Sequence, residues 1–269
     1  MKNKKMRNLF ILSFLIFPQF LYCQFPVLDS KLSSWQYIGN SGFTKTNDVY
    51  FGFKVSQQGY PIVAFQDNFS NNHASAMEFN GSTWVFIGNQ GFTPGQVSGV
   101  DLAINQDDQP YIVFSDLNYS GKLSVMKYTG SSWDYVGAPG FTSESAEFFS
   151  IAMNSSGIPY IAFVDRAYTE KVTVMEFNGS SWIVVGTPGF SSYVIGSTDI
   201  KFNQSNQPCI VYEDGINSLK ITLMIFNGTS WVNWGIPGPP AESDINIKFA
   251  TDKVSSFAGS SKGTYATPV

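Results

Sequence analysis

The sequence predicts an all-β fold built from a repeat, and three observations support this. A 49-residue period runs through the chain. Each period contains four short segments in which apolar residues alternate with polar ones or run together, which is typical of strands. Clusters of Gly, Asn, Ser and Pro, the residues that favour turns, separate these segments. Four antiparallel strands in a repeated unit of about 40 to 50 residues are typical of a β-propeller blade.

Four residue types mark the period, and they recur without a gap. They are Trp35, Trp84, Trp133, Trp182 and Trp231; Gly39, Gly88, Gly137, Gly186 and Gly235; Pro61, Pro110, Pro159 and Pro208; and Asp67, Asp116, Asp165 and Asp214. We therefore interpret each period as one structural unit, and we name its expected strands a, b, c and d.

The strands follow one another in a fixed order, for which residues 150–186 serve as the example. Strand a is expected at 150–154, strand b at 159–163, strand c at 173–177 and strand d at 182–186. The recurring proline opens strand b, where a missing N–H costs least. The Asn178-Gly179 pair between c and d supplies the positive φ values of a tight hairpin. No helix is expected.

The two ends of the chain predict the number of blades. Strand d stands alone at Trp35–Gly39, four complete sets follow to Gly235, and the remainder has room for a, b and c but not d. We expect the N-terminal strand to pair near Thr264–Pro268 and so to complete a fifth blade, which would close the ring and remove open edges. The last segment lacks the Pro and Asp of strand b. A degenerate fifth blade and a chain cut from a longer array therefore both remain open.

Residues 1–24 are expected to be an export signal, followed by a single propeller domain over 25–269. Lys2, Lys4, Lys5 and Arg7 precede an apolar stretch over 9–22, which is shorter than the ~20 residues of a membrane span. We expect a secreted or cell-surface protein, with the periplasm possible and no membrane insertion after cleavage. Tyr22 disfavours lipid modification of Cys23. Cys209 then remains without a disulfide partner and is expected to be a small buried residue.

Composition argues against several classes of function. The net charge is −4 with scattered Lys and Arg, so nucleic acid is not an expected partner. The single histidine, His73, is expected in solvent and cannot build a zinc site or a Ser-His-Asp triad, so no metal or cofactor is expected. A glycosidase needs two carboxylates in different environments. The recurring aspartates are equivalent, and Glu144, Glu147 and Glu213 form no recognisable pair. We expect no enzymatic activity.

The candidate binding residues lie in loops. In an up-and-down blade the d–a and b–c connections emerge on one face, and loops on a rigid scaffold commonly carry function. The candidate ligand-binding residues are Phe43, Phe92, Phe141 and Phe190 in the d–a loops, with Asp67, Asp116, Asp165, Asp214, Tyr119 and Tyr168 in the b–c loops, where Phe69 also lies. Aromatic faces could stack on a sugar while carboxylates bind its hydroxyls. Alternatively, the phenylalanines fill the gaps between blades and the aspartates cap turns.

The recurring tryptophans and the methionines of strand c are expected to be packing residues. The methionines are Met77, Met126, Met175 and Met224, which share a strand face with Phe79, Tyr128, Phe177 and Phe226. Neither set is expected to bind a ligand.

Three resemblances follow from these motifs. The c–d turns Gly81-Ser82-Thr83-Trp84 and Gly179-Ser180-Ser181-Trp182 resemble the end of the Asp-box of sialidase-type propellers, but its aspartate position falls at Phe177, which implies topology and not sialidase activity. Repeat length, expected blade count and the Trp and Gly positions look like tachylectin-type five-bladed lectins, which bind N-acetylated amino sugars between blades. Their binding residues do not align with this chain. Residues 25–269 also resemble exported bacterial repeat propellers that carry no known activity.

The sequence therefore predicts a secreted, non-enzymatic binding module. The resemblance to lectins implies carbohydrate binding or adhesion through repeated pockets between blades, with a glycan as partner. The alternative is a protein-interaction or cell-surface scaffold propeller that binds a surface protein and no sugar.

Overall fold

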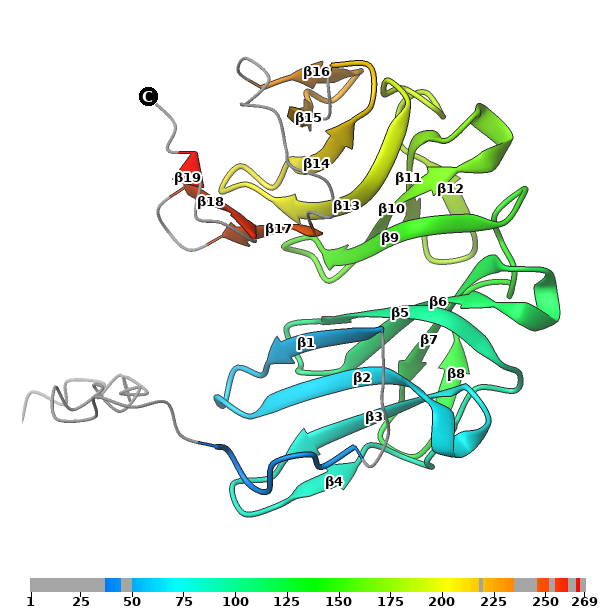
Figure 1. The fold of residues 1–269 in the computed structure, drawn as a ribbon, viewed down its shortest axis with the longest axis vertical. Coiled ribbons are helices and arrows are strands. Elements are labelled where there is room, and N and C mark those ends of the chain that lie inside the picture. Colours follow the sequence, from blue (N-terminus) through cyan, green and yellow to red (C-terminus); the bar gives the residue numbers. More distant parts are fainter. Residues whose placement is uncertain are drawn as a thin grey trace, which may run out of the picture. The chain divides into compact units, whose positions relative to one another are not determined.

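A computed structural model gives the arrangement of the chain (Figure 1). It describes residues 37–44, 50–217 and 220–234, together with the backbone of 246–251, 255–260 and 265–266. The chain divides into two compact units, residues 1–35 and 36–269, and every described residue belongs to the second unit. The expected export signal over 1–24, Cys23 and Trp35 lie outside the described residues, so the domain boundaries and export stay predictions.

The second unit is all-β, with four sheets of four antiparallel strands, as the strand pattern predicted. We call these sheets blades 1 to 4. Blade 1 contains β1 (Phe51–Val55), β2 (Pro61–Asp67), β3 (His73–Phe79) and β4 (Trp84–Phe86); blade 2 contains β5 (Val97–Ile104), β6 (Pro110–Asp116), β7 (Lys122–Tyr128) and β8 (Trp133–Tyr135). Blade 3 contains β9 (Ala146–Met153), β10 (Pro159–Asp165), β11 (Lys171–Phe177) and β12 (Trp182–Val184); blade 4 contains β13 (Val194–Phe202), β14 (Pro208–Asp214), β15 (Lys220–Phe226) and β16 (Trp231–Asn233).

The prediction of five four-stranded blades closed by the N-terminal strand is wrong. The last described sheet has three strands, β17 (Asn246–Thr251), β18 (Ser255–Ser260) and β19 (Tyr265–Ala266), and β19 pairs with β18. Residues 37–39, the described part of the expected closing strand, are not in a strand. The carbonyl oxygen of Ile38 instead accepts a hydrogen bond from the indole of Trp84 in blade 1. The rest of the expected pairing lies outside the described residues.

Each strand b begins at the recurring proline and ends at the recurring aspartate. Short 3-10 helices follow in the first three blades: η1 (Asn68–Ser70), η2 (Leu117–Tyr119) and η3 (Arg166–Tyr168). The aspartate before each helix is extended, with φ −91° at Asp67, and its side chain caps the first turn. The expectation of no helix was therefore wrong for these three turns.

Strand a is longer than expected in blades 2 to 4. It begins at Val97, Ala146 and Val194, and in blade 3 this lies upstream of the start expected at 150. The pairing register with strand b shifts in each of these blades. Such β-bulges insert extra residues and let pairing continue. The strict apolar pattern is lost at the bulge, which is why the sequence did not reveal the true start.

Consecutive blades pack through apolar clusters that lie between their sheets. The first strands β1, β5, β9 and β13 are neighbours in that order. The cluster between blades 1 and 2 includes Ile62, Ala64 and Ala76 from blade 1 with Leu102, Ile112 and Phe114 from blade 2, and equivalent clusters join blades 2 to 3 and 3 to 4. Burial of one large apolar side chain is worth about 1.5–3 kcal/mol, so each sheet is stabilised largely by its neighbours.

The recurring tryptophan joins each blade to the preceding one. Trp133, Trp182 and Trp231 donate their indole N–H groups to the carbonyl oxygens of Ile87, Val136 and Val185 at 2.8–2.9 Å. These three side chains are 7–8% exposed, which confirms their predicted burial, while Trp84 is partly buried. Gly88 has a φ of +73°, and a Cβ there would lie 3.0 Å from Nε1 of Trp133, so glycine is needed beneath the indole.

The sulfur-containing residues behave as packing residues. Met77, Met126 and Met224 are buried within or beside the clusters, and Met175 is partly buried. Cys209 is buried without a disulfide, as expected. Burial raises the pKa of its thiol to about 11, so the thiol is protonated at neutral pH.

We expect Trp182→Phe to lower the free energy of unfolding by about 1–3 kcal/mol, because the carbonyl oxygen of buried Val136 loses its donor. Trp84→Phe is the matched control, since its acceptor belongs to exposed Ile38 and water can replace the indole. Urea unfolding followed by circular dichroism measures both losses. Equal losses would contradict a stabilising role for the buried hydrogen bond.

Candidate functional site

The b–c and d–a connections of a blade meet at one end of its sheet. The N–H of Phe92, in the loop after β4, donates to the carbonyl oxygen of Ala74 near the start of β3. The N–H of Val97 donates to the carbonyl oxygen of Asn72 in the b–c connection. Blades 2 and 3 repeat both hydrogen bonds through Phe141 and Ala146 and through Phe190 and Val194. The loops expected to share one face therefore do so.

The recurring aspartates are buried, and their carboxylates are bonded to the chain itself. Oδ1 accepts the backbone N–H two residues later, in Asp67, Asp116, Asp165 and Asp214 alike. Oδ2 accepts the hydroxyl eight residues later, from Ser75, Ser124, Thr173 and Thr222, at 2.7–3.2 Å. The structure thus places all four aspartates as turn caps.

The same hydroxyls connect the caps to the d–a loops. In blades 1 to 3 each hydroxyl oxygen also accepts the N–H of a loop glycine, from Gly91, Gly140 and Gly189, at 2.8–3.0 Å. We call this series the aspartate–hydroxyl–glycine chain. It ties the b–c turn, strand c and the d–a loop together, so the carboxylates expected to bind a ligand are already committed to the scaffold.

The four loop phenylalanines stack on tryptophans. Phe43, Phe92, Phe141 and Phe190 lie parallel to Trp84, Trp133, Trp182 and Trp231, with ring centroids 4.0–4.7 Å apart and interplanar angles of 5–16°. Stacked aromatic pairs contribute about 0.5–1.5 kcal/mol beyond the area they bury. One face of each phenylalanine is therefore occupied by an indole, which places these residues as fillers between blades.

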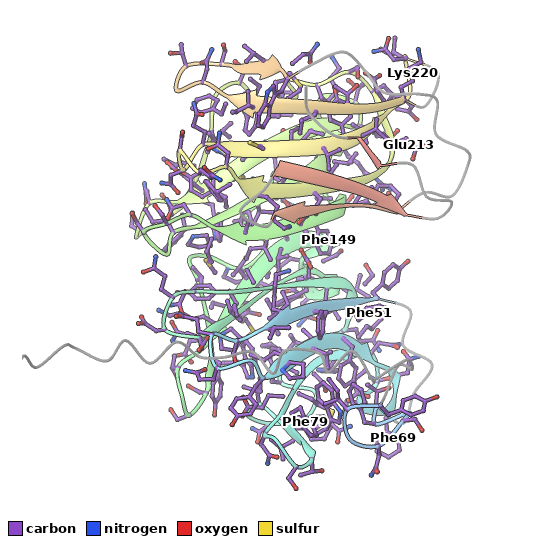
Figure 2. All side chains as sticks on the ribbon, turned by 90° about the vertical axis from the view of Figure 1, so that its left-hand side faces the viewer. Phe51, Phe69, Phe79, Phe149, Glu213 and Lys220 are labelled. Carbon is purple, nitrogen blue, oxygen red and sulfur yellow. The ribbon has the colours of Figure 1, made fainter. Side chains whose placement is uncertain are left out.

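Three other candidate residues remain accessible at the b–c connections. Tyr119 and Tyr168 end η2 and η3 and are 41% and 43% exposed, and Phe69 projects from η1 with 70% exposed (Figure 2). A Cβ at Gly140 would lie 2.7 Å from the Cβ of Tyr119, so the d–a loop packs directly against the base of that ring. The two tyrosines are thus exposed at their tips and supported at their bases.

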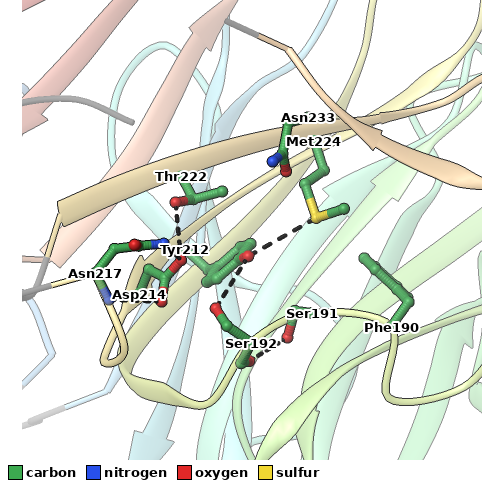
Figure 3. A pocket seen from close by; sticks show the side chains of 9 residues that line it. All are labelled: Phe190, Ser191, Ser192, Tyr212, Asp214, Asn217, Thr222, Met224 and Asn233. Atoms are coloured by element: carbon green, nitrogen blue, oxygen red, sulfur yellow. Dashed lines mark hydrogen bonds between the residues drawn. The ribbon is translucent and has the colours of Figure 1, made fainter. Parts of the chain in front are cut away.

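A pocket of about 280 Å³ lies at the loop end of blade 4 (Figure 3). We call it the blade-4 pocket. It is lined by Phe190, Ser191, Ser192, Tyr212, Asp214, Asn217, Thr222, Met224 and Asn233. Tyr212 lies at its centre, with its hydroxyl 3.3 Å from Oγ of Ser192 and 3.8 Å from Sδ of Met224. Hydroxyl and amide groups thus face one apolar ring and one thioether.

The polar lining arises where blade 4 departs from the repeat. Tyr212 stands where the other blades have the fully buried Phe65, Phe114 and Phe163. Asn233 stands where they have Phe86, Tyr135 and Val184, and Asn217 where they have Ser70, Tyr119 and Tyr168. These differences bring one hydroxyl and two amides into a position that is elsewhere largely aromatic or apolar.

Other blades use the space beside the aspartate differently. In blade 1, Nε2 of Gln90 donates to Oδ2 of Asp67 at 2.8 Å. In blade 2, burial and the carboxylate of Asp116, which accepts the Tyr135 hydroxyl, raise the pKa of Tyr135 to about 12. In both blades a long side chain satisfies the carboxylate. In blade 4 the short Asn217 does so, with Nδ2 2.7 Å from Oδ2 of Asp214.

The blade-4 pocket contains one negative charge and no cationic side chain among its lining residues. Burial alone would raise the pKa of Asp214, but hydrogen bonds from Ser192, Asn217 and the backbone together hold it below its usual range. Burial raises the pKa of Tyr212, so its hydroxyl is protonated and can donate at neutral pH. A neutral ligand with several hydroxyl groups suits this lining better than an anion.

The remaining titratable candidates are dispersed. Glu147 forms an exposed ion pair with Arg166, and Glu213 is buried in β14. His73 begins β3, is partly buried and places Nδ1 2.6 Å from the carbonyl oxygen of Thr93, so its expected position in solvent was wrong. Within the described residues, no three His, Cys, Asp or Glu side chains gather as a metal site.

Among the residues that the structure describes, no helix is long and apolar enough to cross a membrane.

Sequence reasoning missed Tyr212, Ser192, Asn217 and Asn233 as site residues. A signal existed, because three of these positions differ in chemistry from their counterparts 49 residues earlier: Phe163, Tyr168 and Val184. Recurrence at 49-residue intervals indicates a structural role that all blades share. The informative residues are those at which one repeat differs.

Comparison with solved structures finds similar folds, including two proteins described as lectins. AofleA from Arthrobotrys oligospora matches with a TM-score of 0.56 and 10% identity over 74% of this chain and 59% of that chain. The SapL1 lectin, solved with alpha methyl fucoside, matches with a TM-score of 0.54 and 11% identity over 77% and 69%. The six-bladed Aleuria aurantia lectin, described with a fucose recognition mode, matches with a TM-score of 0.52 and 16% identity over 72% of this chain and 61% of that chain.

At these identities the likeness shows the fold, an all-β propeller with four-stranded blades. The chain spans about three-fifths of the length of AofleA and of the Aleuria aurantia lectin. This neighbour has six blades, so it does not support the expected number of five blades, which is that of tachylectin-type lectins. No protein-family model matches the sequence, and no curated protein matches it significantly.

We expect Asp116→Ala to lower the free energy of unfolding by about 2 kcal/mol, because the N–H of Asn118 and the buried hydroxyl of Ser124 both lose a charged acceptor. Ser124→Ala is the control: it keeps the cap at Asn118 and should cost less. Urea unfolding measures both variants. Unchanged stability of Asp116→Ala combined with lost ligand binding would favour a ligand-binding role for this aspartate.

Acid should weaken the caps of Asp67 and Asp214. Burial raises the pKa of Asp67, but hydrogen bonds from Gln90, Ser75 and Ser70 outweigh it and hold the pKa below its usual range. The stabilisation is therefore complete above the unfolded pKa of about 3.9 and is lost as pH falls through the lower folded pKa.

We expect the melting temperature of the Asp67→Ala variant to fall less between pH 6 and pH 2 than that of the unaltered protein. Asp107→Asn, on an exposed turn, serves as the control and should keep the full acid-induced fall. Thermal melts across this pH range measure the difference. Identical acid profiles for Asp67→Ala and the unaltered protein would rule out this linkage.

Proposed function

We propose that this protein is a lectin-like carbohydrate-binding module that binds one neutral monosaccharide unit in the blade-4 pocket. The observation that carries the proposal is the departure of blade 4 from the repeat. Tyr212, Asn217 and Asn233 gather a hydroxyl and two amides beside Phe190. Sugars offer hydroxyl groups and apolar C–H faces, so a few placed polar groups beside an aromatic wall provide both kinds of contact.

Pocket size and charge support the same ligand class. A volume of about 280 Å³ lies just below the ~300–1,000 Å³ typical of ligand sites, which favours one sugar unit over a long chain. The ionised Asp214 and the lack of a cation among the lining residues disfavour sialic and uronic acids. Neutral hexoses, deoxyhexoses and N-acetyl sugars remain.

The solved neighbours suggest the first ligands to test. SapL1 was solved with alpha methyl fucoside, and the Aleuria aurantia lectin is described with fucose recognition. The tachylectin resemblance adds N-acetylglucosamine. The expected set of repeated pockets is not retained in the proposal, because the combination of Tyr212, Asn217 and Asn233 occurs only in blade 4 among the four described blades. Export and surface location stay part of the proposal through residues 1–24.

A second candidate function, protein interaction without sugar, is favoured by one observation. The b–c connections expose apolar side chains at Phe69, Leu117, Tyr119, Tyr168 and Ile216, between 41% and 71%. Exposed apolar groups gathered on one face often mark a protein interface. A scaffold of this kind predicts no response to sugars and no effect of changes inside the blade-4 pocket.

We expect methyl-α-L-fucoside or N-acetylglucosamine to bind the purified protein, and Tyr212→Phe to weaken that binding about threefold to tenfold through one lost hydrogen bond. The repeat itself carries Phe at this position in three blades, so the variant should fold. Isothermal titration calorimetry measures the affinity, and N-acetylneuraminic acid serves as the charged comparison.

Tyr135→Phe is the matched control, because it removes a hydroxyl from blade 2 outside the pocket. It should leave sugar affinity unchanged. The proposal fails if no neutral sugar on a glycan array binds the unaltered protein, or if both tyrosine variants change affinity equally.

A further inference from the structure

The d–a loop between blades 3 and 4 forms one wall of the blade-4 pocket. Phe190, Ser191 and Ser192 of this loop line the pocket (Figure 3). The same loop also contacts the b–c connection of blade 3, because a Cβ at Gly189 would lie 2.5 Å from the Cβ of Tyr168. The b–c connection of blade 3 is therefore separated from the pocket by a single stretch of chain.

Tyr193 follows Ser192 and lies at the edge of the pocket. Its carbonyl oxygen accepts the N–H of Gly215 at 2.9 Å, and Gly215 directly follows the pocket residue Asp214. The hydroxyl of Tyr193 donates a hydrogen bond to the carboxylate of Glu170 in the b–c connection of blade 3, which raises the pKa of the tyrosine. Tyr193 is thus fixed at its backbone and at its tip, while 41% of the residue stays exposed.

Tyr168 adds a second aromatic ring at the same edge. It ends η3, is 43% exposed and packs at its base against Gly189. Glu170 lies two residues further along the chain, and its carbonyl oxygen accepts the N–H of Val194, the neighbour of Tyr193, at 2.9 Å. Both tyrosines therefore flank the short d–a loop that forms the pocket wall. We call Tyr168, Glu170 and Tyr193 the tyrosine rim.

The tyrosine rim departs from the repeat at the same junction as the blade-4 pocket. The earlier counterparts are Gly95 and Glu144 for Tyr193, and Asn72 and Gly121 for Glu170. The scaffold therefore folds without a tyrosine–carboxylate pair at the junctions of blades 1 to 2 and 2 to 3. Among the three described junctions, the pair occurs only beside the pocket that is itself an exception to the repeat.

We propose that the tyrosine rim binds a second neutral sugar unit, linked to the unit in the blade-4 pocket, so that the ligand is an oligosaccharide. The proposal rests on the proposed function, because it takes the pocket as the first sugar site. An exposed tyrosine ring offers a rigid apolar face at low cost in conformational entropy. The carboxylate of Glu170 accepts hydrogen bonds from sugar hydroxyl groups and disfavours an acidic unit at this position.

The covalent link between the two sugar units makes the contact with the rim intramolecular. A stacking contact too weak to hold a free monosaccharide therefore still raises the affinity for a disaccharide. We expect N,N′-diacetylchitobiose to bind about tenfold more tightly than N-acetylglucosamine, or fucosyllactose about tenfold more tightly than methyl-α-L-fucoside. Isothermal titration calorimetry on the full purified chain measures the four affinities.

Tyr193→Ala should remove this gain and leave the monosaccharide affinity unchanged. The change suits the fold, because the small Gly95 occupies the position in the loop between blades 1 and 2. Tyr193→Phe keeps the ring and should keep most of the gain. If Tyr193→Ala does not fold, Tyr168→Ser tests the same rim, since Ser70 is its counterpart in blade 1. Tyr119→Ala, which removes a similarly exposed ring from blade 2, is the control and should leave every affinity unchanged.

Equal affinities for the monosaccharide and the disaccharide in both pairs would overturn the proposal and leave the blade-4 pocket as the sugar site. An equal loss of both affinities in Tyr193→Ala would overturn it as well, because the tyrosine would then act on the first unit. A loss in Tyr119→Ala as large as that in Tyr193→Ala has the same meaning, since the effect would not belong to the rim. If neither sugar pair binds the unaltered protein, the tyrosine rim and the proposed function fall together.

Discussion

The hydrogen bond from each recurring indole to the preceding blade is the interaction on which the other contacts depend. Trp133 reaches the carbonyl oxygen of Ile87, and Phe92 stacks on the same ring. One side chain therefore fixes both the end of strand d and the loop that follows it. That loop brings Gly91 to the hydroxyl of Ser75, so the position of the aspartate–hydroxyl–glycine chain follows from the position of the tryptophan.

Because the recurring polar groups already bond to one another and to the backbone, they have little capacity left to bind a ligand. Asp116 is buried and accepts hydrogen bonds at both carboxylate oxygens. A buried carboxylate stripped of such partners would be costly, which explains why the residue recurs at the same place in blades 1 to 4. Recognition has to use side chains that are free to change without breaking a cap, and blade 4 changes Tyr212 and Asn233.

The strand order and turns could be predicted from the sequence because they depend on local signals. Proline, Asn-Gly and alternating apolar residues act over a few positions, and the structure follows them from Pro61 onward. The blade count could not be predicted in the same way. The expectation of five blades assumed that every segment with room for a strand forms one. Tyr37 and Ile38 instead adopt the conformation of a loop before a blade. The roles of the Phe and Asp residues were open because stacking on indole and stacking on sugar require the same residue types.

The spacing of the indole hydrogen bonds has a consequence for synthesis. Donor and acceptor are 46 residues apart at each of the three junctions between blades 1 to 4, so the loop that must close does not lengthen as blades are added. Closure entropy depends on that loop length and stays constant from one junction to the next. During translation the chain can therefore fold blade by blade, and each new tryptophan that leaves the ribosome locks the blade before it.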